Sequence, residues 1–186
     1  MPERVCVFID GSNLYHLCRE NFGRTDLNIG MFAQWLVGPN RTLVRTYYYN
    51  CPLPPDHPPE KVSAQQRFFG KLARTPYVEV RLGKLVQRTG HPCAKCGDQN
   101  VRWVEKGVDM RIGIDMLSAA SRNLYDVAVL GSGDGDLAEA VRAVKDLGRH
   151  VEVTGFTNGT AYELVQAADV LRKVTTADVQ SCWVRT

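Results

Sequence analysis

The chain has 186 residues, of which 44% are hydrophobic and 23% charged, and its formal net charge is +3. This composition argues against disorder, and the length suits a single domain over residues 1–186 with a substantial core. The small net charge excludes a polybasic chain, so any affinity for nucleic acid must come from a local basic surface.

The sequence carries no sign of a membrane or secreted protein. No apolar run approaches the roughly 20 residues that a membrane helix needs, and the start MPERVCVFID passes straight into a strand-like pattern. The cysteines are scattered, as expected of reduced thiols rather than a disulfide framework. We therefore expect a cytoplasmic protein.

Apolar periodicity predicts alternating strands and helices along the chain. The expected strands span 4–9, 42–51, 77–88 (with a kink at Gly83), 126–131, 150–155 and 170–174. The expected helices span 13–22, 28–37, 60–74, 108–122, 136–147 and 160–168. Residues 89–105 break this pattern and are expected to form a small insertion. The alternation predicts an α/β fold with a central, mostly parallel sheet.

Two acidic clusters stand where expected strands end. VCVFIDGSN ends in Asp10 and Asn13, and VAVLGSGDGD ends in Asp134 and Asp136. Ligands of open parallel sheets bind beyond the carboxyl ends of the strands, where the strand order reverses. Carboxylates gathered there repel one another unless a cation lies between them, and Mg²⁺ and Mn²⁺ prefer such oxygen ligands. The alternative is ordinary turn and cap chemistry.

A third acidic element, EKGVDMRIGIDML, belongs to an expected helix. Asp109 lies in the first turn, where the helix dipole favours a carboxylate. Asp115 points to a different face, so a site role and a contact within the fold remain equal alternatives. Ser12 and Ser132 add neutral oxygen atoms beside the acids and are candidate substrate-binding residues.

These blocks together resemble a known family. FIDGSNLY, KGVDMRIGIDML and VLGSGDGDLAEAVRAVKDLGRHVEVTGF are similar, in order and spacing, to NYN domains of the LabA-like branch of the PIN-domain nuclease superfamily. The resemblance covers residues 4 to about 174 and implies a Rossmann-like, PIN-like three-layer fold. It carries the acidic centre of the family over to Asp10, Asn13, Asp109, Asp134 and Asp136, with Asp115 as a further acid.

The resemblance implies a metal-dependent ribonuclease acting on single-stranded RNA. One or two Mg²⁺ or Mn²⁺ ions would lower the pKa of a water molecule and neutralise phosphate oxygens. Asp10 and Asp134 are the expected direct ligands, whereas Asp136 and Asp109 would act through water. The main alternative is a catalytically weak module that keeps the fold and binds RNA or a protein. A phosphatase that uses an aspartyl nucleophile is disfavoured because Ser12 breaks the D-x-D pattern.

Basic side chains near these blocks are candidates for phosphate contacts. They are Lys84, Arg88, Lys106 and Arg111, for which a solvated face is the alternative. Tyr47, Tyr48 and Tyr49 could stack on bases, but alternation between the two faces of a strand is the favoured interpretation.

Cys93-Ala-Lys-Cys96-Gly has the form of one half of a zinc ribbon. No second pair follows nearby, so four ligands would need His91, Cys51, His57 or a symmetric second copy of the chain in a homodimer. The alternative is a reduced hairpin without metal.

Overall fold

The central sheet is six-stranded and parallel, in the order β3-β2-β1-β6-β7-β8. The computed structural model describes residues 1–54, 56–90, 96, 99 and 101–184. The strands of this sheet are β1 (Glu3–Asp10), β2 (Arg41–Asn50), β3 (Val78–Leu82), β6 (Val127–Gly131), β7 (His150–Gly155) and β8 (Val170–Lys173). The α/β fold with a parallel central sheet, expected from the sequence, is confirmed.

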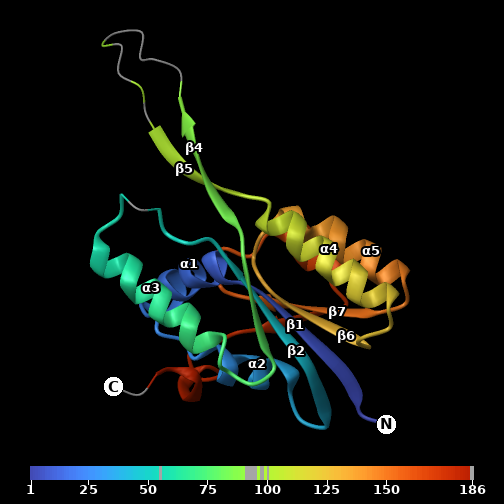
Figure 1. Cartoon of the computed structure of the whole chain (residues 1–186). Helices are drawn as coiled ribbons and strands as arrows, with labels where there is room; N and C mark the ends of the chain where they lie inside the picture. Colours follow the sequence, from blue (N-terminus) through green and yellow to red (C-terminus); the bar gives the residue numbers. More distant parts are fainter. Residues whose placement is uncertain (55, 91–95, 97–98, 100, 185–186) are drawn as a thin grey trace.

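Helices cover both faces of this sheet (Figure 1). One face packs against α1 (Gly11–Phe22), α2 (Ile29–Val37) and α3 (Pro59–Leu72). The other packs against α4 (Val108–Ser121), α5 (Ala138–Asp146) and α6 (Tyr162–Ala167). Short 3₁₀ turns, η1 (Gly135–Leu137) and η2 (Gln180–Cys182), complete the described elements.

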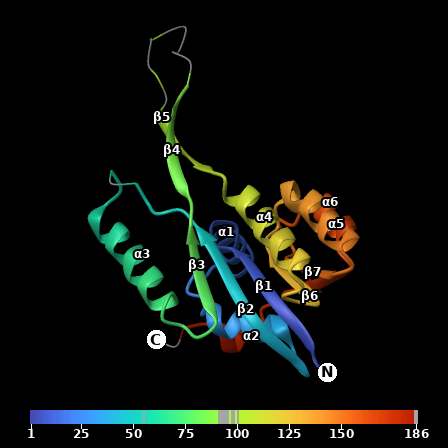
Figure 2. The same ribbon diagram turned by 45° about the vertical axis from the view of Figure 1, so that its right-hand side comes forward.

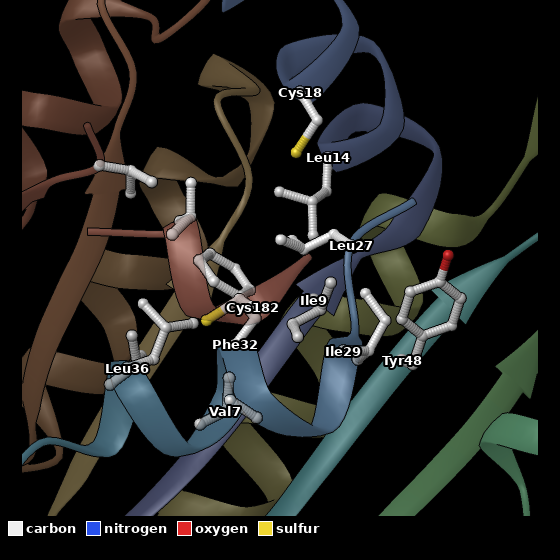
Figure 3. Packing of buried hydrophobic residues seen from close by; sticks show 14 of the residues in the cluster. Val7, Ile9, Leu14, Cys18, Leu27, Ile29, Phe32, Leu36, Tyr48 and Cys182 are labelled. Carbon is white, nitrogen blue, oxygen red and sulfur yellow. The ribbon is translucent and has the colours of Figure 1, made fainter. Parts of the chain in front are cut away.

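Strand β1 is buried on both faces, which is why its sequence is an unbroken apolar run. Val7 and Ile9 enter the core under α1 and α2, beside Leu14 and Phe32 (Figure 3), whereas Phe8 enters the opposite core. The tyrosines of β2 alternate in the same way, since Tyr48 lies in the first core and both its neighbours lie in the second. The alternation expected for them is confirmed.

The strand order reverses at β1. The chain passes from β1 outward to β2 and β3, then returns to place β6 on the opposite side of β1. The two strands pair in parallel from Val5↔Val127 to Ile9↔Gly131, so their carboxyl ends share one edge of the sheet. The prediction that Asp10 and Asp134 follow adjacent strands at the same edge is therefore confirmed.

A two-stranded antiparallel ribbon projects from this edge of the sheet (Figures 1 and 2). It consists of β4 (Lys84–Thr89) and β5 (Val101–Lys106). The strand expected over 77–88 breaks at Gly83, where a kink was expected, but the two halves belong to different sheets. The Gly83 N–H donates to the Asn50 carbonyl at 2.8 Å, and the chain leaves the central sheet there. Residues 101–105, which the sequence analysis assigned to an insertion, form most of β5 and pair with β4.

None of the helices in the described parts of the chain is both long and apolar enough to cross a membrane.

A buried carboxylate links distant strands on one face of the sheet. Glu152 of β7 is 5% exposed and lies between two guanidinium groups. Arg41 Nη1 is 2.7 Å from Glu152 Oε1, and Arg172 Nε is 2.6 Å from Glu152 Oε2. The carboxylate thus bridges the two arginines, of which Arg41 also pairs with Glu3 at 2.8 Å, and ties β2, β7 and β8 together.

We predict that Glu152→Ala destabilises the protein by about 3–5 kcal/mol, because it leaves two partly buried cations without their shared partner. Urea unfolding measures this difference. The matched control is Glu139→Ala, which removes an 86% exposed carboxylate paired with Arg142 and should cost less than about 1 kcal/mol. Equal effects of the two substitutions would contradict the structural role of Glu152.

Candidate metal centre

Asp10 is fixed at the point where β1 becomes α1. Its carboxylate caps the helix, because Oδ1 accepts from the Asn13 backbone N–H at 3.0 Å. Its other oxygen accepts from the Ser132 hydroxyl at 3.4 Å. Only 4% of Asp10 is exposed, so a charged group is held in a position with little solvent.

Side chains also fix the loop after β6 against α1. Asn13 Oδ1 accepts from the Gly133 N–H at 2.8 Å, and Ser132 Oγ accepts from the Asp134 N–H at 3.2 Å. A Cβ at Gly133 would lie 2.1 Å from the Gly159 carbonyl oxygen, so only glycine permits this close approach. Asn13 and Ser132, which the sequence placed at the site, therefore set the relative positions of Asp10 and Asp134.

The remaining predicted acids surround this junction. Asp134 caps η1, with Oδ1 accepting from the Asp136 N–H at 3.0 Å, and Asp136 itself is exposed. Asp109 lies in the first turn of α4 and is half-buried. The carboxylates thus come from three separate segments of the chain.

These carboxylates act on one another electrostatically. Burial raises the pKa of Asp10 to about 7 despite the opposing Asn13 hydrogen bond, and the charges of Asp109, Glu105 and Asp134 raise it further. Burial also raises the pKa of Asp109, helped by the charges of Asp134, Asp136 and Glu105. The carboxyl edge is therefore a region of concentrated negative charge.

Glu105 is a member of this group that sequence analysis missed. It lies on β5, opposite Leu85 of β4, and its charge raises the pKa of both Asp10 and Asp109. The signal for it was the strand-favouring residues Val101, Trp103 and Val104 in VRWVEK. We assigned 89–105 to an irregular insertion, so that signal was not used.

The donor set fits a hard divalent cation in type, because carboxylate and hydroxyl oxygens are its preferred ligands. The raised pKa of buried Asp10 also means that its ionised form is unfavourable at this position, and a bound cation would stabilise that form. Among the described residues, no group of three or more His, Cys, Asp and Glu side chains is close enough to hold an ion. Mg²⁺ often keeps several waters and binds through one or two carboxylates, so Asp10 and Asp134 would suffice as direct ligands.

Asp115 lies in a different environment. Its Oδ2 accepts from the Tyr49 hydroxyl at 3.0 Å and forms an ion pair with Arg81. Arg81 also pairs with Glu79 at 2.9 Å and stacks over the ring of Tyr47 at 4.3 Å. Of the two alternatives for Asp115, the structure shows the contact within the fold.

Three of the four predicted basic residues lie on one face of the ribbon. Lys84 is opposite Lys106, and Arg88 is opposite Arg102, a residue that sequence analysis did not select. Directly paired residues share a face, so these four side chains lie on one face of the ribbon. Trp103 and Glu105 lie on the other face.

The fourth predicted basic residue, Arg111, is exposed on α4, and its Nη1 donates to the Leu82 carbonyl at 3.1 Å. Ser12, in the first turn of α1, is partly exposed next to Asp10.

The zinc hypothesis concerns a part of the chain that the structure describes incompletely. Cys93 and His91 lie outside the described residues, and Cys96 is exposed. Of the other suggested ligands, Cys51 is buried and His57 Nδ1 lies 3.6 Å from Asp56. Zinc at Cys93 and Cys96 therefore stays a prediction.

The chain thus combines a parallel α/β sheet with acidic side chains at its switch point. Residues 4–175 match the family model of the NYN domain, and the chain belongs to this family, which is a PIN-like nuclease family.

Two individual proteins illustrate the relationship. The chain is distantly related to the low amplitude and bright protein LabA of Synechococcus elongatus, with 28% identity over 182 residues, covering 97% of this chain and 87% of LabA. A crystal structure of VPA0982, a protein of unknown function from Vibrio parahaemolyticus, is similar with a TM-score of 0.69 and 25% identity, covering 96% of both chains.

We predict that Asp10→Asn stabilises the metal-free protein more at pH 8 than at pH 5. A folded-state pKa of about 7 against an ordinary value of 3.8 means that wild-type stability falls as pH rises through this window. Asparagine keeps the helix cap without the charge. Urea unfolding in EDTA should show a pH-dependent difference on the order of 2–3 kcal/mol between variant and wild type.

The control for this measurement is Asp146→Asn, which removes an exposed carboxylate of α5 and should follow the wild type at both pH values. An Asp10→Asn difference that is the same at pH 5 and pH 8 would show that Asp10 is not a buried acid with a raised pKa.

Proposed function

We propose that this protein is a divalent-metal-dependent ribonuclease that hydrolyses phosphodiester bonds of single-stranded RNA at the carboxyl edge of β1 and β6. The observation that carries the proposal is the position of Asp10 and Asp134 at the topological switch point of an NYN fold. The negative charges of Asp109 and Glu105 also act on Asp10 there. A phosphodiester is anionic, so it would approach this edge only together with cations.

Each acidic side chain would have a distinct part. Asp10 and Asp134 would hold the ion directly, because the Ser132 and Asn13 contacts fix the two loops that carry them. Asp109 and Asp136 would orient the attacking water, since both are more accessible than Asp10. When bound, Mg²⁺ or Mn²⁺ supplies charge neutralisation at the phosphate and a lower pKa for water.

The ribbon offers a separate means of attracting RNA. Lys84, Arg88, Arg102 and Lys106 place four cations on one exposed face, and like charges directly opposite each other destabilise a strand pair. Phosphate groups would relieve that repulsion and supply affinity without sequence preference. Ser12 and Ser132 would complete the polar surface next to the acids.

The experiment is a cleavage assay on single-stranded RNA, duplex RNA and single-stranded DNA, with Mg²⁺, Mn²⁺ or EDTA. We expect cleavage of single-stranded RNA that is lost in EDTA and returns with Mn²⁺ or Mg²⁺. Asp134→Asn should lower the rate by roughly a hundredfold or more, because it removes a direct ligand. Asp146→Asn, which removes a carboxylate from an exposed part of α5, should retain wild-type activity.

Two results would contradict the proposal. One is equal cleavage by wild type and Asp134→Asn, which would indicate a contaminating nuclease. The other is RNA binding in the presence of metal without cleavage of any nucleic acid. The second result would favour the alternative function, a binding or regulatory module on the same fold.

A further inference from the structure

A cleft of about 810 Å³ opens beside the acidic edge. It is bounded by α1, the end of β2, α3 and the ribbon, and its apolar floor includes Leu14, Leu27 and Ile29, which Figure 3 shows together near Tyr48. This volume falls within the roughly 300–1,000 Å³ of typical small-molecule sites, so the cleft is large enough for an organic ligand.

The cleft is continuous with the candidate metal centre. Gly11 and Ser12, which follow Asp10 directly, line it, and so does Glu105. A Cβ at Gly11 would lie 2.2 Å from the phenol of Tyr48, so the Tyr48 ring packs on the first turn of α1, next to Asp10. A ligand in the cleft therefore lies beside the acids that we assign to catalysis.

Aromatic side chains surround the opening. Tyr15 is 48% exposed and Phe68 is 37% exposed, although both line a concave surface. Trp103 is held in orientation because its Nε1–H donates to Asp56 at 2.8 Å, and Phe68 meets Tyr48 edge-to-face at 5.7 Å. Fixed, accessible rings are the surfaces on which flat heteroaromatic ligands stack.

Polar groups in the same cleft could form hydrogen bonds with the edge of a heteroaromatic ring and pair with a phosphate attached to it. The Asn50 amide is oriented by Tyr48 and Cys51, since it donates to the Tyr48 hydroxyl at 3.2 Å and accepts from the Cys51 N–H at 2.7 Å. One amide hydrogen of Asn50 is left over from these bonds. Lys61 is exposed at the lining and supplies a positive charge for a phosphate.

We propose that this cleft binds one nucleobase of the RNA strand, stacked on Trp103 and its aromatic neighbours, beside the phosphate at the acidic edge. The inference rests on the proposed ribonuclease function and adds to it a site that selects the base next to the cleavage point. Proteins recognise single-stranded RNA in this manner, by stacking unpaired bases on aromatic rings and reading their edges with amides.

Calorimetric titration in the presence of Mg²⁺ tests this site without catalysis, because a nucleoside monophosphate has no phosphodiester bond to cleave and its phosphate needs a cation at the acidic edge. The probes are the four ribonucleoside 5′-monophosphates, with ribose 5-phosphate as the matched ligand that lacks a base. At least one nucleotide should bind at least tenfold more tightly than ribose 5-phosphate. Trp103→Ala and Tyr15→Ala should each weaken that binding by about tenfold, the loss of one base–aromatic stack. Leu147→Ala, at an exposed apolar residue that follows α5, should bind as the wild type does.

The results separate this inference from the proposed function. Equal affinity for nucleotides and ribose 5-phosphate, or wild-type affinity in both aromatic variants, overturns the base site even if RNA is cleaved. Base-dependent binding that the aromatic variants lose supports it even if no RNA is cleaved. Circular dichroism shows whether the Trp103→Ala variant is folded. If that variant is unfolded, the binding measured with Tyr15→Ala, which changes an exposed residue, tests the base site instead.

Discussion

The main constraint on the candidate site is the burial of one carboxylate, that of Asp10, at the junction where the strand order reverses. An isolated charge in such a position is costly, and burial together with three neighbouring acids raises the pKa of Asp10 to about 7. A fold optimised for stability alone would place an apolar or neutral residue there. The cost is consistent with a site arranged for a cation and its anionic ligand.

The architecture around Asp10 serves to fix this junction. Strand β1 is central in the sheet and buried on both faces, so the backbone that carries Asp10 has little freedom. Ser132 and Asn13 then join the loop after β6 to the start of α1 by side-chain hydrogen bonds. The ribbon adds Glu105 to the same edge and separates a basic face from the face that bears Trp103. One edge of the sheet thus combines an acidic centre, an aromatic cleft and a basic surface.

Sequence patterns predicted the parts of the fold that local chemistry determines. The apolar runs ending in Asp-Gly and Ser-Gly marked the ends of β1 and β6, and parallel pairing then placed Asp10 and Asp134 together. The environment of Asp115 could not be predicted in this way, because this residue of α4 is contacted by Tyr49 of β2 and Arg81 of β3, which are distant in the sequence. Glu105 was missed for a related reason. Its position depends on the pairing of β4 with β5, and residues 90–100 separate these two strands in the sequence, so local patterns do not reveal the pairing.

The most direct test of the account is diffraction from crystals soaked in Mn²⁺, recorded for the anomalous signal of manganese. The account predicts a peak at the carboxyl edge between Asp10 and Asp134, and its loss in crystals of Asp134→Asn. A manganese peak elsewhere, with none between these two carboxylates, would contradict the assignment of this edge as a metal centre.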